Sequence, residues 1–269
     1  MRNNVQEIEQ ILAEGHYIDW EWVLEYNYII LLDDIKPLSI IDIGANMGRH
    51  AQVFTEILKC SYLMMFEPIP HLCADLQAIF SDKPVDVFQC ALGAREGSSS
   101  FFVKPAAIGE SGLRRRSSYN DGRSDDLEEI VVQVRTLDSF DPPGPISYIK
   151  IDTEGGEIDI LKGAAKLLKR DRPAISVEFG RGGYDAYGYG PEALFSVASE
   201  LGYAIFDLVG TPFVTQQDWL NGVDRIYWDY LMLPMERADW FRPKIERIRS
   251  SVVNELRRGI LDSQRNAGG

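Results

Sequence analysis

The chain has 269 residues, of which 45% are hydrophobic and 26% charged, a composition typical of an ordinary globular protein with one large or two small domains. Its net charge of -13 argues against a broad nucleic-acid surface, because such a surface needs clustered lysine and arginine, and the only basic cluster is Arg114 to Arg116. No apolar run approaches the roughly 20 residues of a membrane span, and the N-terminus lacks a signal-peptide core, so we expect a soluble, cytoplasmic protein.

The first 36 residues predict two helices. Val5, Ile8, Ile11 and Leu12 share one helical face, and the segment from Trp22 to Ile30 repeats the same spacing. We therefore expect residues 1–36 to form an N-terminal helical extension that precedes the main domain.

After Lys36-Pro37, short apolar runs alternate with helical stretches, a pattern that predicts parallel βαβ units. We expect a doubly wound α/β domain over residues 37–235, with a mostly parallel sheet and one antiparallel late strand at Ile226–Leu233. The other expected strands are Ser39–Ile43, Tyr62–Phe66, Val85–Gln89, Ser147–Ile151 and Ala174–Phe179, and the expected helices are Arg49–Lys59, His71–Phe80 and Glu157–Arg170.

One region interrupts this alternation. Ser98–Val103 and Ile130–Thr136 predict two extra strands, joined by a polar span rich in glycine and serine. We expect residues 104–129 to form a flexible loop near the site, although a surface insertion would have the same composition.

Residues 236–269 predict a C-terminal helix and tail. Along this helix, one apolar stripe consists of Ile245, Ile248, Val252, Leu256 and Ile260. Such a stripe usually packs on its own domain, and it also permits a homodimer.

The first expected strand ends in a glycine turn, "IDIGANMGRH", with Asp42 just before it. Ligands of open α/β sheets bind beyond the carboxyl ends of the strands, and Gly44 and Gly48 would let the backbone approach a ligand closely. The dinucleotide fingerprint fails, because Asn46 and Arg49 occupy two of its glycine positions, and no GK[ST] motif follows the turn.

Glu67 ends the second expected strand, where a carboxylate can accept hydrogen bonds from both ribose hydroxyls. It could instead cap the following helix. Asp42 could hold the amides of the turn or reach a ligand through water. A nucleoside without a pyrophosphate, bound against glycines and acids, matches S-adenosylmethionine, because its sulfonium and amino groups are cationic.

Acids also follow the strand Ser147–Ile151. Glu157 suits a helix N-terminus, whereas Asp152 would lie beside the glycine turn if the strand order reverses there. Asp152 with Glu154 or Glu178 could bind magnesium, but we expect no metal, since acid clusters of this kind are more often not metal sites. The odd cysteine count without CxxC spacing predicts buried thiols rather than disulfides or zinc ligands at Cys60, Cys73 and Cys90.

Six ordered segments together resemble the FkbM-type methyltransferase family over about half of the chain, from Ile40 to Gly180. This resemblance implies an S-adenosylmethionine-dependent enzyme with the class I Rossmann-like fold, extended here by N-terminal and C-terminal helices, that methylates hydroxyls. The segments are IDIGANMGRHAQVF, FEPIPHLCADL, CALGAREGSSSFFV, VRTLDSF, YIKIDTEGGEIDILKGA and PAISVEFG.

The resemblance also implies roles for individual residues. Asp152 and Glu154 would face the transferred methyl group and the acceptor, whereas Asp138 matches a family position without an evident chemical role. The expected cofactor-binding residues are Asp42, Gly44, Asn46 and Gly48 for the methionine half, Glu67 with Pro68 for the ribose, Gln89, Cys90, Ala91 and Leu92 for the adenine, and Asp152.

A hydroxyl acceptor needs a general base, for which we expect Asp152 or Glu154, with His50 as the third candidate. The expected partner is a small-molecule or glycan hydroxyl, and the tyrosines of "GRGGYDAYGYG" could stack on a sugar ring. The same glycines could also serve a structural loop. A non-catalytic S-adenosylmethionine- or nucleotide-binding module and an NAD-dependent oxidoreductase stay as alternatives.

Overall fold

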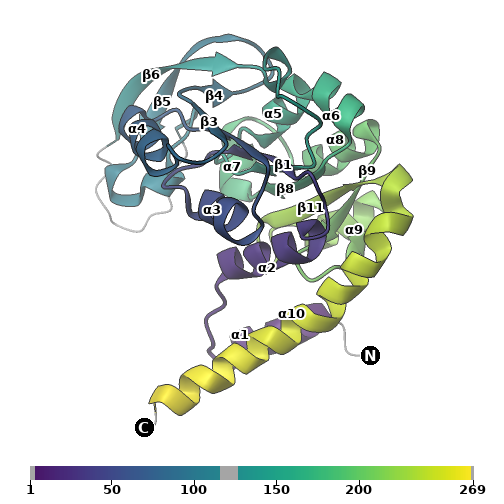
Figure 1. The fold of residues 1–269 in the computed structure, drawn as a ribbon. Coiled ribbons are helices and arrows are strands. Elements are labelled where there is room, and N and C mark those ends of the chain that lie inside the picture. The colour runs from purple at the N-terminus through teal and green to yellow at the C-terminus, as the bar shows by residue number, and fades with distance from the viewer. Residues whose placement is uncertain (1–3, 116–126, 268–269) are drawn as a thin grey trace.

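The computed structural model describes residues 4–115 and 127–267, and an eight-stranded sheet runs through its centre (Figure 1). The strand order is β10-β9-β11-β8-β7-β1-β2-β3. The strands are β1 (Ser39–Ile43), β2 (Tyr62–Phe66), β3 (Val85–Phe88), β7 (Tyr148–Ile151), β8 (Ala174–Glu178), β9 (Tyr203–Asp207), β10 (Pro212–Phe213) and β11 (Asp229–Pro234).

Strands β3, β2, β1, β7 and β8 are parallel, and β11 is antiparallel to both of its neighbours, β8 and β9. The predicted doubly wound, mostly parallel sheet with an antiparallel late strand is therefore confirmed. All five residues of β1 are buried, as expected for a central strand covered by helices on both faces. The strand order reverses between β1 and β7, so ligand-binding residues are expected at that edge.

Helices cover both faces of this sheet (Figure 1). They are α1 (Asn4–Ala13), α2 (Trp20–Leu32), α3 (Arg49–Gln52), α4 (Pro70–Ile79), α5 (Glu157–Gly163), α6 (Ala165–Asp171), α7 (Arg181–Ala186), α8 (Ala193–Leu201), α9 (Gln216–Gly222) and α10 (Ala238–Ala267), with short helical turns at Val53–Ile57, Pro105–Glu110, Leu137–Ser139 and Met235–Arg237. None of the helices within the described ranges combines the length and apolar character needed to cross a bilayer.

Two predicted helices differ from the observed ones. The helix expected over Arg49–Lys59 continues from α3 as a π-helical turn over Val53–Ile57. The helix expected over Glu157–Arg170 divides at Ala164, because Asp138 accepts hydrogen bonds from the backbone amides of Lys166 and Leu167 and so caps α6. Asp138 therefore has a structural role in positioning this helix.

The two extra strands form a separate, smaller sheet with a short third strand, in the order β4-β6-β5. β5 (Gly97–Val103) pairs antiparallel with β6 (Glu128–Arg135), and β4 (Ala91–Leu92) lies on the other side of β6. The expected loop 104–129 begins with the short helix Pro105–Glu110 and is described as far as residue 115. Residues 116–126 of that prediction lie outside the described residues.

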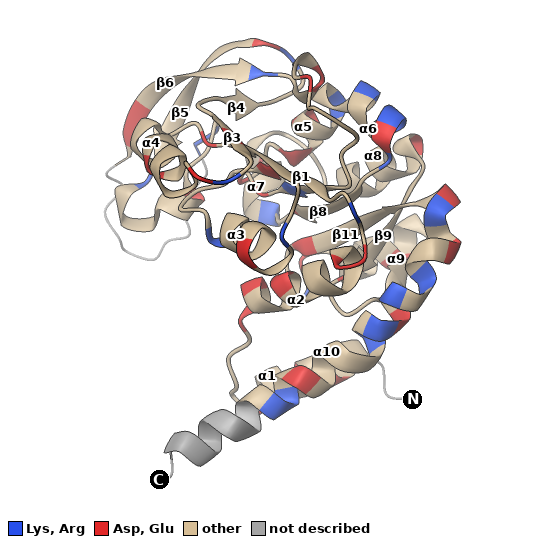
Figure 2. Ribbon diagram, in the orientation of Figure 1, with Lys and Arg blue, Asp and Glu red and all other residues tan. Residues whose placement is uncertain are grey.

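The terminal helices pack against each other and against the sheet domain. α10 contacts α2, α1 and β11, and Ile248 and Val252 of its apolar stripe are fully buried. Leu256 packs against the same core, and the side chain of Ile260 lies outside the described part. Basic and acidic residues alternate along α10 (Figure 2), as on a solvent-exposed helix face. The predicted packing of the stripe on its own domain is therefore confirmed.

Candidate functional site

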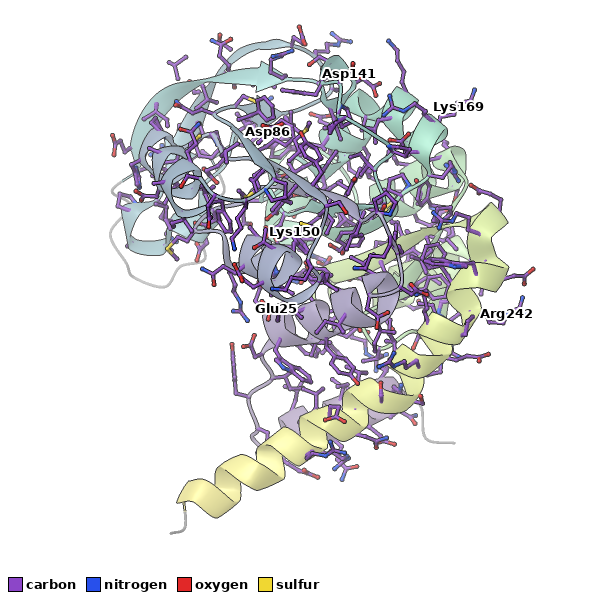
Figure 3. The ribbon with its side chains drawn as sticks, viewed as in Figure 1. Glu25, Asp86, Asp141, Lys150, Lys169 and Arg242 are labelled. Atoms are coloured by element: carbon purple, nitrogen blue, oxygen red, sulfur yellow. The ribbon has the colours of Figure 1, made fainter. Side chains whose placement is uncertain are left out.

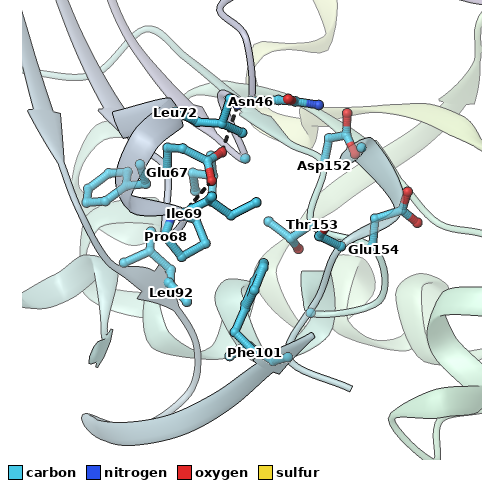
Figure 4. Close-up of a pocket in the computed structure, with 18 of the residues that line it drawn as sticks. Asn46, Glu67, Pro68, Ile69, Leu72, Leu92, Phe101, Asp152, Thr153 and Glu154 are labelled. Carbon is cyan, nitrogen blue, oxygen red and sulfur yellow. Dashed lines mark hydrogen bonds between the residues drawn. The ribbon is translucent and has the colours of Figure 1, made fainter. Parts of the chain in front are cut away.

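A pocket of about 250 Å³ opens at the carboxyl ends of β1, β2 and β7, at the reversal of strand order. Figure 4 shows Glu67 on one side of it and Asp152 and Glu154 on the opposite side. Predicted site residues that line the pocket are Gly44, Asn46, Glu67, Pro68, Cys90, Ala91, Leu92, Asp152 and Glu154.

The glycine turn approaches the strand end of β7 too closely for a side chain. Gly44 has φ 77°, and a Cβ on it would lie 1.8 Å from the carbonyl oxygen of Asp152. Gly48 has φ 80° and packs against Leu76 and Phe80, so it shapes the turn without lining the pocket. A side chain is therefore excluded at Gly44 by the backbone of Asp152 and at Gly48 by the side chains of Leu76 and Phe80.

Glu67 fastens the glycine turn to the start of α4. Its carboxylate accepts one hydrogen bond from the amide of Asn46 at 2.9 Å and another from the amide of Ile69 at 2.9 Å (Figure 4). Burial raises the pKa of Glu67 to about 7, against the opposing effect of those two amides. Each oxygen keeps a further lone pair, so helix capping and a ligand contact are compatible roles for this carboxylate.

Lys150, which the sequence analysis did not single out, lies in the interior beneath the pocket, whereas Lys169 and Arg242 are exposed (Figure 3). Its Nζ lies 3.1 Å from Asp152 Oδ2 and 3.6 Å from Asp42 Oδ1. Burial opposes a charge on Lys150, but the two carboxylates outweigh it and raise the pKa of the ammonium group. Lys150 therefore stays charged and joins the two strand ends electrostatically.

Asp42 occupies a different position from the one expected. It is 1% exposed, does not line the pocket and faces Lys150. The amide of Asn46 in the turn is bound by Glu67 instead. Asp42 therefore acts on the site through its charge, on Lys150 and on Glu67, rather than by lining the pocket.

Asp152 and Glu178 form a coupled carboxyl pair at the ends of neighbouring strands. Burial opposes ionisation of Asp152, but the charge of Lys150 and a hydrogen bond from Glu178 lower its pKa. Burial and the charge of Asp152 raise the pKa of Glu178 well above its ordinary value. Asp152 is therefore the more acidic carboxyl of the pair, and Glu178 keeps its proton to a higher pH.

The turn between Asp152 and α5 is held by Glu157. Its Oε1 accepts hydrogen bonds from the amide of Gly155 at 2.8 Å and from the hydroxyl of Thr153 at 3.0 Å. Glu154 within this turn has φ 61°, a left-handed conformation that is strained for a non-glycine residue, and it lines the pocket. Glu157 therefore has a structural role, in keeping with its position at a helix start.

His50 lies behind the pocket rather than in it. It is 8% exposed, and its Nε2 lies 2.6 Å from Oε2 of Glu21, which does line the pocket. The hydrogen bond from His50 lowers the pKa of Glu21. Glu21 comes from α2, so the N-terminal extension contributes to the site, a role that the helical spacing of that segment does not reveal.

The end of the pocket near β2 and β4 is apolar. Cys90, Ala91 and Leu92 lie there as expected, whereas Gln89 is exposed and does not line the pocket. Phe101 of β5 adds a wall that the sequence analysis missed. Ile108 and Leu113 also line the pocket, so the described part of the expected loop 104–129 lies near the site, as predicted. The three cysteines are buried and unpaired, as predicted. Within the described ranges, no group of three or more potential ligands has an arrangement that could hold a metal ion.

A doubly wound sheet with a late antiparallel strand, β11, an acid after β2 and a ligand pocket at the strand reversal define the class I methyltransferase fold. Residues 42–205 match the family model described as the methyltransferase FkbM domain. The chain therefore belongs to the FkbM methyltransferase family. The match extends beyond Gly180, where the resemblance in the sequence was expected to end.

Two relatives match about half of the chain each. "Methyltransferase 1" from Beauveria bassiana is 28% identical over 168 residues, which are 54% of this chain and 68% of that protein. "Hexuronic acid methyltransferase AglP" from Haloferax volcanii is 24% identical over 143 residues, covering 52% of this chain and 56% of its own length.

Two solved structures resemble the chain at lower sequence identity. Methyltransferase FkbM from Methylobacillus flagellatus KT has a TM-score of 0.46 and 17% identity, covering 80% of this chain and 50% of that chain. SMU.1697c from Streptococcus mutans, in complex with SAH, has a TM-score of 0.46 and 9% identity, covering 81% of this chain and 99% of that chain.

Proposed function

We propose that this protein is an S-adenosylmethionine-dependent O-methyltransferase that acts on a hydroxyl of a sugar or natural-product acceptor. The observation that carries the proposal is one pocket with a glycine turn held by Glu67 at one side and Asp152, paired with Lys150, at the other. The sugar acid named for the Haloferax volcanii relative supports a carbohydrate acceptor.

The lining residues fit the cofactor. Glu67 offers carboxylate lone pairs for the ribose hydroxyls, and the apolar wall of Cys90, Ala91 and Leu92 suits the adenine ring. Gly44 and Asn46 line the pocket at the turn and lie where the methionine half would bind. The bound cofactor would supply a methyl group on a positively charged sulfur, and the neutral thioether that remains is a good leaving group.

The residues of the chain perform the remaining tasks. Lys150 keeps Asp152 ionised, and Asp152 accepts the proton of the acceptor hydroxyl at its carboxylate. A positioned general base contributes about 10²–10⁴-fold to the rate of such a reaction. Phe101 and Leu113 cover the pocket and exclude water, so that the acceptor is aligned without competing hydrolysis.

The test is transfer of a tritiated methyl group from S-adenosylmethionine to a panel of sugar and natural-product acceptors. Asp152→Asn should lower turnover by about 10²–10⁴-fold, because an amide cannot accept the proton. Asp86→Asn, a change of the same type on the exposed edge strand β3, should have no effect. Full turnover in Asp152→Asn with unchanged cofactor affinity would refute the role of Asp152, and cofactor binding without any methylated product would favour a binding module.

A further inference from the structure

Glu21 is the residue through which the N-terminal extension reaches the cofactor pocket. It lies in the first turn of α2, its side chain is 44% exposed, and it lines the pocket together with Gly44 and Asn46 of the glycine turn. Its Oε2 is buried and lies 2.6 Å from Nε2 of His50, in the helix α3 that follows the same turn. This contact holds the carboxylate beside the turn, and the other oxygen keeps its lone pairs for a ligand.

The carboxyl group of Glu21 is charged in this position. The hydrogen bond from His50 lowers the pKa of Glu21 and outweighs burial, which acts in the opposite direction. The charges of Asp152 and Lys150 also act on Glu21, with opposite signs, so Glu21 lies near the end of β7. The pocket therefore has an ionised carboxylate from α2 at the end formed by β1 and β7.

S-adenosylmethionine would place its amino acid group at this end of the pocket. The apolar wall from Cys90 to Leu92 suits the adenine, and Glu67 suits the ribose. The methionine half then extends past the glycine turn toward Asp152, on the side opposite Glu67 (Figure 4). That half ends in an ammonium group, which only donates hydrogen bonds and binds most strongly to a carboxylate.

Three other acids near this end are less suited to bind an ammonium group. Asp42 is 1% exposed, faces Lys150 and does not line the pocket. Asp152 lines the pocket but is paired with the same lysine at 3.1 Å. Burial and the charge of Asp152 raise the pKa of Glu178 well above its ordinary value. Of these four acids, Glu21 alone is both ionised and without a lysine partner among the described residues.

The tyrosines of "GRGGYDAYGYG", residues 180–190, are used in other contacts. Tyr184 is 1% exposed and donates a hydrogen bond to Asp224 at 2.6 Å. The hydroxyl of Tyr189 is bonded to Asp159. The predicted stacking of a sugar on Tyr184 or Tyr189 therefore has no support from the structure, and neither hydroxyl is available to the cofactor.

We propose that Glu21 binds the ammonium group of the cofactor's amino acid and so ties the N-terminal helices to the bound cofactor. The inference rests on the proposed methyltransferase function and extends it to the cofactor contacts. Glu21 takes the part in binding the methionine half that the sequence analysis gave to Asp42. It lies outside the matched family domain, which begins at residue 42.

The direct test is calorimetric titration of three ligands into the wild-type protein and Glu21→Gln. S-adenosylhomocysteine carries the ammonium group and a carboxylate, its decarboxylated form carries the ammonium group alone, and methylthioadenosine carries neither. Glutamine has nearly the size of glutamate but no charge, so the variant should bind both ammonium-bearing ligands about tenfold more weakly, at the low end for a charged hydrogen bond because Glu21 is partly exposed. Its affinity for methylthioadenosine should stay within about twofold of the wild type.

Glu25→Gln is the matched control. Glu25 lies on the same helix, its Oε1 is 3.8 Å from Nδ1 of His50 and 2.9 Å from Nε of Arg49, and it does not line the pocket. This variant should leave all three affinities within about twofold of the wild type. Amide hydrogen exchange is the second readout: at equal saturation, S-adenosylhomocysteine should slow exchange over α2 more than methylthioadenosine does, and Glu21→Gln should remove that difference.

The outcomes distinguish this inference from the proposed function. If the folded wild-type protein binds none of the three ligands, the proposed function fails. If it binds S-adenosylhomocysteine but Glu21→Gln weakens all three ligands alike, or none of them, the contact with the ammonium group is refuted and the proposed function stands. A loss that spares the decarboxylated ligand also refutes the contact, and equal protection of α2 by S-adenosylhomocysteine and methylthioadenosine refutes the tie to the N-terminal helices.

Discussion

Replacement of Glu67 by glutamine should separate ligand binding from turn stability. In the wild-type protein, each carboxylate oxygen accepts one backbone amide, from Asn46 or from Ile69. Glutamine has one acceptor oxygen, so one of these buried amides loses its partner, which costs about 1–3 kcal/mol of stability. A ribose hydroxyl loses a charged acceptor as well. Because such a bond contributes about 1.5–3 kcal/mol, the affinity for S-adenosylhomocysteine should fall by about 10–100-fold.

The assay is isothermal titration calorimetry at pH 8, with denaturant unfolding as the separate measure of stability. Glu157→Gln is the matched control, because Glu157 is also buried, accepts a turn amide and has a pKa raised to about 7 by burial. Glu157 does not line the cofactor pocket, so the cofactor affinity of its variant should change by less than about threefold.

A ligand pair tests the contact itself. Adenosine should bind the wild-type protein more tightly than 2′,3′-dideoxyadenosine, and this difference should disappear in Glu67→Gln. If Glu67→Gln loses stability yet binds S-adenosylhomocysteine within twofold of the wild type, the carboxylate only holds the turn and the ribose role is refuted.

Three further predictions follow from the charges around the pocket. Ribose hydroxyls favour the ionised form of Glu67, whose pKa is raised to about 7, so S-adenosylhomocysteine should bind more tightly at pH 8 than at pH 6 by calorimetry; equal affinities would contradict this. Burial raises the pKa of Glu157 in the folded protein to about 7, above its ordinary 4.5, so its contribution to stability is fully present below pH 4.5 and is lost as the pH rises through 7. Between pH 5 and pH 8, the free energy of unfolding should therefore fall by up to about 3 kcal/mol more in the wild type than in Glu157→Gln. Parallel pH profiles of the two proteins would contradict this. Lys150→Met leaves Asp42 and Asp152 without their buried cation, so the free energy of unfolding in denaturant should fall by about 3–5 kcal/mol. A stability equal to that of the wild type would show that Lys150 does not stabilise these two carboxylates.

Local patterns predict the central sheet well. β1 and β2 have the predicted bounds, because a buried parallel strand is a continuous apolar run and a turn or proline stops it. The position of Asp152 beside the glycine turn follows from strand order, which the alternation of strands and helices indicates. The break between α5 and α6 depends on a cap from Asp138, a contact 28 residues away that no local pattern contains.

Residues that act through distant partners could not be predicted. Lys150 interrupts an apolar strand, and its partner Asp42 lies on another strand, so its charge has no explanation before the fold is known. Glu21 belongs to a helix whose spacing predicts only a buried face, and its place in the pocket depends on its contact with His50.

The most direct test of the account is calorimetric titration of S-adenosylhomocysteine and of NAD into the wild-type protein. We predict micromolar binding of S-adenosylhomocysteine and no binding of NAD, because the turn lacks the glycines that accommodate a pyrophosphate. Failure of folded protein to bind S-adenosylhomocysteine, or preferential binding of NAD, would contradict the assignment of this pocket to a methyl donor.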